Sequence, residues 1–558
     1  MQLVIGLLAG SLLQLVFPFL TQTIVDQGIG HRNLNFIQLI LAAQLMLVFS
    51  RTLIEVIRRC ILLHISTRVN VSLISDFLSK LMRLPMRFFD SKLAGDLIRR
   101  IEDHNRIESF LTQSVLNILF STLTVVIFGI VLAIYSWKIF LIFILFSLAY
   151  IGWVKLFMRK RADLNRKNFE LMSVNQNNLM QLIYGMQDIK LLGCEQQKRW
   201  EWENIQASLF RINMSSLNLG QWQQVGAVLI NEVKNVLITV LSATAVLHGS
   251  ITLGVMLSIQ YIIGQMQGPV TQFVSFMQDT QDAQLSLERL GEIHGKPDEE
   301  TEGMDQETEI SGKDPIRLNN VIFTYGSEKS KRIIKGLSLD IPAGKTTAIV
   351  GLSGSGKTTL IKLMLGFYPP TEGTVTIGRQ SLQKISFKEW RKHCGVVMQE
   401  GFIFGDTIAN NIVPDGNMID KKRLLYAVEM ANIRDFVESL PLKYNTKIGN
   451  TGQGLSQGQK QRILIARAIY RNPDYLFFDE ATNALDTDND KVIQGNLEKS
   501  IKDKTVVIVA HRPSTVKNAD QIVVLKEGEI TEKGTHDELI TRQGDYYRLV
   551  KNQLELSA

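Results

Sequence analysis

The sequence predicts an α-helical transmembrane domain of six spans with long cytoplasmic helical extensions, followed by a soluble α/β domain. Long apolar runs fill residues 1–290, whereas residues 316–558 have the mixed composition of a soluble domain. Hydrophobic residues make up 45% of the 558-residue chain and charged residues 21%, which argues against a disordered chain. The three cysteines lie far apart, which excludes a disulfide framework and favours a reducing compartment.

Six segments reach the length of about 20 apolar residues that a helix needs to cross a bilayer core. We place them at residues 2–25, 36–60, 110–133, 138–157, 225–247 and 254–277. The first lacks the basic start and the small-residue cleavage site of a signal peptide. We therefore expect a membrane helix whose preceding residues are missing.

Basic residues gather in the connections that follow the second and the fourth span, while the other connections are short and poor in cations. The positive-inside preference places both long connections and both termini in the cytoplasm. It also accounts for the net charge of +7 without a nucleic-acid partner, and no basic patch with interleaved aromatic residues indicates one.

Helical periodicity continues through 60–83 and 155–222, so the spanning helices are expected to extend well beyond the bilayer. The helix-breaking residues of these connections are Pro85, Gly95 and Gly185. Short helices near 94–100 and 184–191 would then form two cytoplasmic tips. Solvated turns are the simpler interpretation, but their distance from the membrane favours docking on a soluble domain.

Polar side chains interrupt the predicted spans. They are Arg51, Glu55, Asn231, Glu232, Lys234, Gln260 and Gln265. Charged groups that face lipid are costly, so such residues usually face a bundle interior or a water-filled path. Arg51 and Glu55 are spaced i,i+4 and can pair. Each residue is compatible with interhelical hydrogen bonding, and the set together favours an aqueous pathway.

Residues 296–315, KPDEETEGMDQETEISGKDP, are acidic, almost free of large apolar side chains and end in proline, and we place the acidic linker at 291–315. This composition predicts a flexible connector between the domains 1–290 and 316–558.

A glycine-rich motif, GLSGSGKTT, follows the apolar strand sequence TTAIV. It consists of Gly351, Leu352, Ser353, Gly354, Ser355, Gly356, Lys357, Thr358 and Thr359. In this pattern, backbone N–H groups cradle phosphate, Lys357 reaches the terminal phosphates and Thr358 is placed to hold Mg²⁺. The motif predicts an α/β P-loop nucleotide-binding domain.

Two carboxylates end the apolar segment YLFFDE, about 120 residues after the glycine-rich loop. Asp479 is expected near Mg²⁺, and Glu480 is placed to orient or deprotonate an attacking water. Shortly before them stands LSQGQ, which comprises Leu455, Ser456, Gln457, Gly458 and Gln459. Taken alone, it is a helix start capped by Ser456.

The order and spacing of these motifs resemble those of ATP-binding cassette proteins. LSQGQ is similar to the signature LSGGQ of that family, with glutamine as its third residue. The resemblance implies that Tyr325 stacks on adenine and that Gln399 senses Mg²⁺ and water. It also implies that His511 lies near the γ-phosphate and that Asp486, in NALD with asparagine in place of the usual serine, belongs to the D-loop. With Glu480 present, ATP hydrolysis is expected.

Six spans ahead of one cassette resemble a half-transporter of the exporter type over essentially the whole chain. LPMRFFDSKLAGDLIRRIED and GMQDIKLLGCE are similar to the two cytoplasmic connections of that family. The resemblance implies coupling helices that dock on cassettes, with Gly95, Asp96, Gly185 and Asp188 at their tips. It further implies a homodimer, because the ATP sites of the family lie between two cassettes and each is completed by the signature of the partner.

Within the exporters, FLTQTIVDQGI, LSQGQKQRILIARAIY and DEATNALDT are similar to the bacterial branch that secretes bacteriocin-like peptides. This resemblance implies a double-glycine-leader peptide as cargo, accessory secretion proteins, and a cassette on the cytoplasmic side of the bacterial inner membrane. Members often begin with a papain-like Cys peptidase domain, but no cysteine precedes the first span here, so peptidase activity is not expected. A separate peptidase, a truncated chain and a relative without processing are the three explanations.

The specific motifs concern ATP and not cargo. Lipids, oligosaccharides and drugs are therefore alternative cargoes. A membrane-tethered regulatory ATPase without transport is an alternative of another class, although the polar residues in the spans and the two tips favour a transporter.

Overall fold

The computed structural model divides the chain into two compact units, Met1–Leu84 with Phe88–Pro297, and Pro85–Arg87 with Asp298–Ala558. It describes residues 2–557 except 93, 301–309, 327–330, 415–417, 450, 451, 453, 482–492, 494, 497–499, 501 and 511–515, and only the backbone of 2–9, 11, 12, 94 and 552–557. The first unit is helical and the second has mixed helices and strands, which confirms the predicted fold class.

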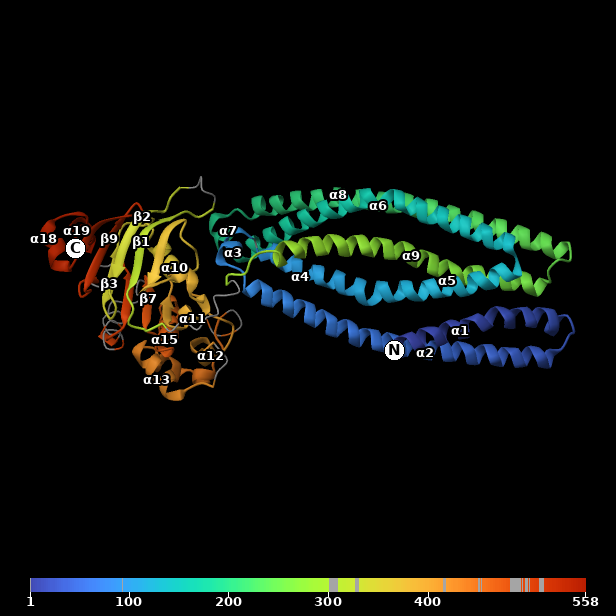
Figure 1. The fold of residues 1–558 in the computed structure, drawn as a ribbon, viewed down its shortest axis with the longest axis horizontal. Helices are drawn as coiled ribbons and strands as arrows, with labels where there is room; N and C mark the ends of the chain where they lie inside the picture. The colour runs from blue at the N-terminus through green and yellow to red at the C-terminus, as the bar shows by residue number, and fades with distance from the viewer. Residues whose placement is uncertain are drawn as a thin grey trace. The chain divides into compact units, whose positions relative to one another are not determined.

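Several helices of the first unit are much longer than a membrane is thick (Figure 1). The elements are α1 Gln2–Thr23, a π-helical turn Ile24–Ile29, α2 Leu34–Met82, α3 Met86–Ser91, α4 Ala94–Ser109, a π-helical turn Phe110–Ser114, α5 Val115–Tyr135, α6 Trp137–Tyr184, α7 Met186–Leu192, α8 Glu195–Leu247 and α9 Leu253–His294. Helices α2, α6 and α8 have 49, 48 and 53 residues. At 1.5 Å per residue each is about 70–80 Å long, so each extends well beyond a bilayer core.

Four helical stretches are long and apolar enough to cross a membrane: Leu34–Met82, Gly95–Tyr135, Trp137–Tyr184 and Glu195–Leu247. The predicted span in α9 does not meet this criterion, whereas α1 lies largely outside the described side chains, which leave out residues 2–9, 11 and 12. In α9 the reason lies in its many glutamines, which lower its hydropathy. The count of six spans therefore stays a prediction.

Helices α6 and α8 run side by side, and α5 lies beside α9 (Figure 1). Phe128, Phe143 and Ile238 belong to the buried cluster that joins these helices. A Cβ on Gly226 would lie 2.3 Å from Trp153, so this glycine allows α8 to approach α6 closely.

The tips of the cytoplasmic connections differ in part from the prediction. The first break, at Pro85, precedes the short helix α3, and the helix predicted near 94–100 is the start of the 16-residue α4. Gly95 does not interrupt α4, and its N–H donates to Asn177 Oδ1 at 3.2 Å. The second break occurs at Gly185 as predicted, and the seven-residue helix α7 follows it.

Two sheets form the framework of the second unit. The antiparallel sheet has the order β2-β1-β4-β5, with β1 Ile316–Phe323, β2 Ile334–Ile341, β4 Glu372–Ile377 and β5 Gln380–Ser381. The other has the order β10-β9-β3-β8-β7-β6, with β3 Thr346–Val350, β6 Cys394–Val397, β7 Tyr475–Asp479, β8 Thr505–Val509, β9 Gln521–Lys526 and β10 Glu529–Gly534. Strands β9, β3, β8, β7 and β6 are parallel, so their carboxyl ends meet at one edge, where open α/β sheets bind ligands.

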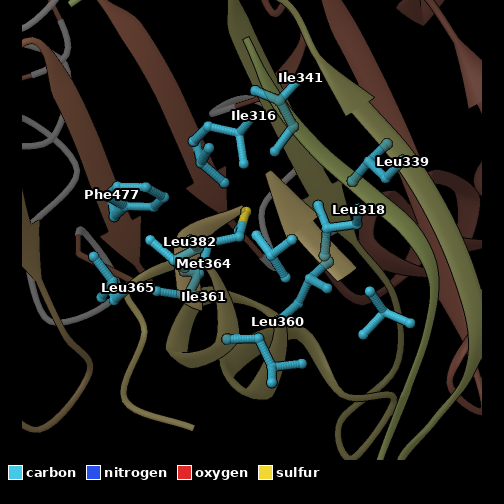
Figure 2. Close-up of a cluster of buried hydrophobic side chains, with 14 of the residues drawn as sticks. Ile316, Leu318, Leu339, Ile341, Leu360, Ile361, Met364, Leu365, Leu382 and Phe477 are labelled. Carbon is cyan, nitrogen blue, oxygen red and sulfur yellow. The ribbon is translucent and has the colours of Figure 1, made fainter. Parts of the chain in front are cut away.

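The helices of this unit pack around the sheets. They include α10 Lys357–Met364, α11 Phe387–Lys392, α12 Ile408–Ile412, α13 Lys421–Met430, α14 Arg434–Ser439, α15 Gln457–Tyr470, α18 His536–Arg542 and α19 Asp545–Ser557. Figure 2 shows the largest core, in which Ile316, Ile341, Leu360 and Phe477 meet between the two sheets and α10. Burial of each such side chain contributes about 1.5–3 kcal/mol, so this core fixes α10 against the sheets.

The start of the acidic linker is bound rather than free. Glu299 accepts hydrogen bonds of 2.9 and 2.6 Å from Arg391, and Glu300 Oε1 accepts from Ser386 Oγ at 2.9 Å and from the Lys388 N–H at 2.7 Å. The prediction of a flexible connector is therefore wrong for these two residues, because their carboxylates find donors around α11. Residues 301–309 of the linker lie outside the described part of the chain.

Candidate functional site

The glycine-rich loop joins β3 to α10. Gly351, Gly354 and Gly356 have φ angles of 156°, 78° and 103°, which glycine adopts without strain. A Cβ on Gly351 would lie 2.1 Å from the carbonyl oxygen of Leu525. Glycine at these positions therefore lets the chain turn tightly at the carboxyl end of β3, directly before the N-terminus of α10.

Lys357, the first residue of α10, is 5% exposed. Its Nζ donates to the carbonyl oxygens of Gly351 and Leu352, both at 3.0 Å. Burial lowers the pKa of the Lys357 ammonium, while the nearby Glu480 and Asp479 oppose this shift. A cationic group thus lies inside the loop, held by backbone carbonyls.

Asp479 ends β7 and is fully buried. Neither of its carboxylate oxygens has a hydrogen-bond partner among the described residues. Burial raises the pKa of the Asp479 carboxyl and Glu480 adds to the increase, while Thr358 and Lys357 oppose it. Unpaired buried carboxylate oxygens are costly, so this site fits a cation ligand such as Mg²⁺.

Glu480 follows with a φ of +52°, a left-handed conformation that is uncommon outside glycine. Its N–H donates to the carbonyl oxygen of Val509 at 3.0 Å, and its own carbonyl oxygen accepts from Gln461 Nε2 at 3.0 Å. The end of β8 and helix α15 thus hold Glu480 in a strained conformation of the kind that clusters at functional sites. Sequence motifs alone did not indicate that Gln461 contacts Glu480.

The LSQGQ segment starts α15. The Ser456 side chain accepts from the Gln459 N–H at 3.2 Å, and Gln459 Oε1 accepts from the Ser456 N–H at 2.9 Å. This reciprocal capping box confirms the helix-cap interpretation. Ser456 and Gln457 are exposed, so the positive end of this 14-residue helix is open to solvent.

Two further predicted residues lie near these elements. The Tyr325 hydroxyl is 3.2 Å from Thr359 Oγ1 in α10, and its ring, which packs edge-on against Phe323, leaves the residue 40% exposed. Gln399 is exposed two residues after the end of β6. His511 and Asp486 lie outside the described residues.

Asn411 and Arg467 were missed by the sequence analysis. Arg467 in α15 donates from Nε to the Asn411 carbonyl oxygen at 2.7 Å and from Nη1 to the Phe402 carbonyl oxygen at 3.0 Å. The buried Asn411 side chain accepts from the Phe404 N–H at 2.9 Å and donates to its carbonyl oxygen at 3.0 Å. These contacts connect α15, the helix that starts with LSQGQ, to the segment after Gln399. The sequence around Arg467 does not reveal them, because the two partners are distant in the chain.

The polar residues predicted in the spans are all described. Only Asn231 and Lys234 bond to each other, at 2.9 Å, with the fully buried Lys234 ammonium 4.9 Å from the centre of the Phe143 ring. The predicted pairing of Arg51 with Glu55 is wrong, because Glu55 binds arginines later in its own helix, Arg58 at 2.7 Å and Arg59 at 3.0 Å. Gln265 accepts a hydrogen bond from Gln14 in α1, whereas Glu232 and Gln260 are exposed.

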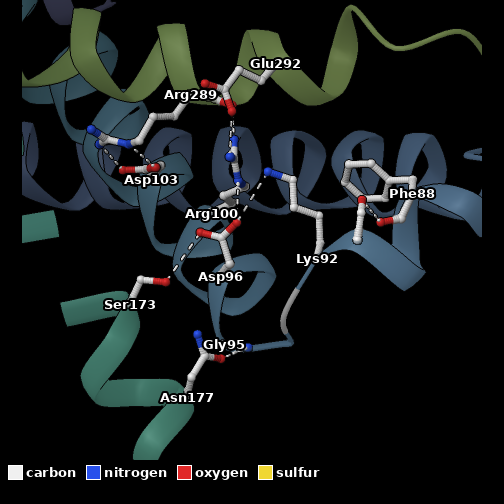
Figure 3. A network of polar contacts seen from close by, with 11 residues as sticks. Phe88, Lys92, Gly95, Asp96, Arg100, Asp103, Ser173, Asn177, Arg289 and Glu292 are labelled. Atoms are coloured by element: carbon white, nitrogen blue, oxygen red, sulfur yellow. Dashed lines mark hydrogen bonds and ion pairs between the residues drawn. The ribbon is translucent and has the colours of Figure 1, made fainter. Parts of the chain in front are cut away.

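The residues predicted at the first coupling tip face their own unit (Figure 3). Asp96 is 3.7 Å from Arg100 and accepts from Ser173 Oγ at 3.5 Å, and Arg100 in turn is 2.7 Å from Glu292 in α9. Asp188 in α7 is exposed, and Gly185 directly precedes α7. The polar network therefore ties the start of α4 to α6 and α9, whereas α7 presents an acidic residue outward.

A glycine-rich loop and buried carboxylate at the edge of a parallel sheet, attached to a helical membrane unit, define a membrane-bound nucleotide-binding protein. Residues 2–270 match the family described as the ABC transporter transmembrane region, and residues 334–483 match the ABC transporter family. The chain is 34% identical to the alpha-hemolysin translocation ATP-binding protein HlyB of Escherichia coli over 96% of this chain and 76% of that protein. It is 33% identical to the toxin RTX-III translocation ATP-binding protein of Actinobacillus pleuropneumoniae over 98% of this chain and 76% of that protein.

A solved bacterial Atm1-family ABC exporter with ATP bound shares the fold, with a TM-score of 0.92, 24% identity, and coverage of 99% of this chain and 97% of the other. The chain belongs to the ABC transporter family as an exporter half-transporter, one membrane domain fused to one cassette. It is accordingly an ATP-binding, ATPase-coupled exporter.

Proposed function

We propose that this exporter moves a peptide or larger polypeptide out of the bacterial cytoplasm as a homodimer with two composite ATP sites. The observation that supports a polypeptide cargo is the similarity along 96–98% of the chain to proteins named for translocation of toxins. The double-glycine-leader peptide expected from the sequence is one form of such a cargo. The cassette and both termini would face the cytoplasm.

The site residues take their roles from their chemistry. The loop N–H groups and Lys357 hold the phosphates, and Tyr325 offers its half-exposed ring to adenine. Asp479 and Thr358, with Gln399, would hold Mg²⁺, which neutralises phosphate charge when bound. Glu480 orients or deprotonates the attacking water, and His511 contributes near the γ-phosphate.

The dimer follows from what one chain provides: one glycine-rich loop and one signature helix. The solvent-exposed N-terminus of α15 carries partial positive charge and favours a phosphate group. We place the ATP of the partner chain there.

Helix α7 supports a coupling role for the second tip. Tyr184, Leu191 and Leu192 around it are 82%, 75% and 78% exposed. Large apolar side chains that gather on an exposed tip favour docking on another protein surface, and we propose a cassette as that surface.

The test is to co-express a Lys357→Ala chain and a Ser456→Arg chain with different tags and to reconstitute the mixed dimers into vesicles. Each variant alone should be inactive. In a mixed dimer both defects fall in one composite site and leave the other intact, so the selected mixed dimers should have roughly half of wild-type ATPase activity, and an unselected random mixture roughly a quarter.

No recovery on mixing would contradict the two-chain site. Uptake of a labelled toxin-type polypeptide by the same vesicles, compared with lipid flip-flop, separates polypeptide export from the other cargoes. ATPase activity without any transport would favour the regulatory alternative.

A further inference from the structure

We infer that a polar cavity between α4, α6 and α9 is a subsite for an extended peptide segment that carries a carboxylate at one end. This inference rests on the proposed polypeptide cargo and adds the chemistry by which the chain recognises it. The cavity has a volume of about 470 Å³. That volume lies within the range of roughly 300–1,000 Å³ that is typical of ligand sites.

Three arginines and two aspartates line the cavity. They are Arg99, Arg106, Arg161, Asp279 and Asp282. Arg161 Nη2 donates to Asp282 Oδ2 at 2.7 Å, so this pair is neutral. Asp279 accepts from Ser114 Oγ at 2.7 Å and makes no ion pair with a described residue.

Arg99 and Arg106 keep their positive charge. They are spaced i,i+7 and therefore share one face of α4. Arg99 is 3.9 Å from Glu102, a carboxylate that is 61% exposed and hence weakly coupled. Arg106 is exposed and makes no ion pair with a described residue.

The environment of Arg99 favours a planar anion. Its guanidinium lies 5.4 Å from the centre of the Phe169 ring, which also lines the cavity. Its buried Nε has no hydrogen-bond partner among the described residues, so the hydrogen-bonding capacity of this guanidinium is not fully used within the fold. Paired N–H donors of this kind match a carboxylate.

The two charged ends of the cavity are far apart. Arg99 precedes Ser114 by 15 residues along the directly consecutive α4 and π-helical turn, or about 20 Å at 1.5 Å per residue. An extended chain of about six residues covers that length. Phe110, Phe169 and Met172 also line the cavity and offer apolar contacts. Asp279, beside Ser114, disfavours a second carboxylate at that end.

The test uses the full-length protein in neutral detergent and a fluorescein-labelled leucine-containing hexapeptide with two glutamates at one end, measured by fluorescence anisotropy. The matched probe has lysines in place of the glutamates. We expect Arg99→Gln and Arg106→Gln each to weaken binding of the acidic probe roughly tenfold, since a charge-assisted hydrogen bond is lost. The control, Arg159→Gln, removes an exposed arginine of α6 that does not line the cavity, and should leave binding unchanged.

Charge reversal sharpens the test. Arg106→Glu should weaken the acidic probe further and strengthen the lysine probe. If the arginines only stabilise the helix bundle, the variants will instead lower the melting temperature and leave the preference for the acidic probe intact, which overturns the inference. Equal affinity for the hexapeptide and for fluorescein-labelled glutamate would also overturn it, because the cavity would then accept any small anion.

ATPase activity and vesicle uptake on the same preparations keep the two proposals distinguishable. If the vesicles take up a polypeptide but probe binding does not depend on the arginines, the subsite is contradicted and the proposed export still stands. Arginine-dependent binding without uptake supports the subsite and contradicts the export.

Discussion

The carboxylate of Glu299 is held by the guanidinium of Arg391, which at the same time lies 4.6 Å from the centre of the Phe367 ring. Arg391 also donates to the carbonyl oxygens of Leu365 and Gly366, at 3.3 and 3.2 Å. One arginine therefore fixes the start of the linker to the end of the helix that begins at the glycine-rich loop.

Arg391→Ala should free the linker and destabilise the cassette, because it removes the ion pair, the ring contact and two carbonyl contacts together. We expect limited proteolysis near residue 300 to accelerate several-fold and the melting temperature of the detergent-solubilised protein to fall. Lys392→Ala is the control, since among the described residues Lys392 pairs only with its helix neighbour Glu389, at 2.6 Å. Equal protease sensitivity of both variants would show that the linker is held by other contacts.

Glu480→Gln should bind MgATP with near wild-type affinity and lower the hydrolysis rate by about 10²–10⁴-fold, the usual contribution of a general base. Lys357→Ala should instead weaken ATP binding, because its ammonium is the buried cation of the loop. Nucleotide binding and phosphate release measured on both variants separate these effects. Turnover by Glu480→Gln within a few-fold of wild type would remove the assigned role.

Asp479→Asn should stabilise the nucleotide-free protein while it weakens Mg²⁺-dependent ATP binding. Burial raises the pKa of Asp479 above its value in the unfolded chain, so the folded state retains a proton that the unfolded state has lost. The carboxyl therefore lowers stability as the pH rises from the ordinary aspartate pKa through the raised one. Below that window the variant and wild type should melt alike, and above it the variant should melt at a higher temperature.

Asp520→Asn is the matched control with the opposite sign. Burial alone would raise the pKa of Asp520, but hydrogen bonds from the Thr346 N–H at 2.8 Å and Lys345 Nζ at 3.0 Å outweigh it and lower the pKa. Its carboxylate stabilises the fold above the ordinary aspartate pKa, and this contribution is lost as the pH falls through the lowered value. Asp520→Asn should therefore melt lower at neutral pH, and a shift of the same sign in both variants would contradict the assignment for Asp479.

The two coupling tips should respond differently to substitution. Asp188→Ala, in the exposed α7, should reduce cargo transport and cargo-stimulated ATPase more than basal hydrolysis, at unchanged melting temperature. Asp96→Ala should lower stability first, because Asp96 lies in the network with Arg100 and Ser173. Transport, ATPase activity and melting temperature should be measured on one preparation. If Asp188→Ala loses transport and basal hydrolysis to the same extent at unchanged stability, α7 has no coupling role.

The cassette was largely predictable because its motifs are local. The glycine-rich loop, the strand that ends in Asp479 and the Ser456 cap each depend on neighbours within a few residues. Their common location follows from the parallel order of β3, β8 and β7.

The wrong predictions concern contacts that spacing along the chain does not decide. Glu55 has arginines four residues before it and three and four residues after it, and spacing alone did not select Arg58 and Arg59. Gly95 is a different case. Glycine usually disfavours a helix, yet α4 includes Gly95, whose N–H donates to Asn177 in the distant helix α6. The tie between Arg467 and Asn411 likewise depends on tertiary contacts between residues 56 positions apart.

The capping box at Ser456 uses the oxygen of the hydroxyl as an acceptor but does not use its proton. The oxygen accepts from the Gln459 N–H, but a serine hydroxyl carries a proton of its own that it can donate at the same time. Helix capping and the proposed donation to a phosphate oxygen therefore use different atoms of one side chain and do not compete. Threonine at this position would keep both properties, whereas alanine would remove both together and aspartate would keep the cap but repel the anion.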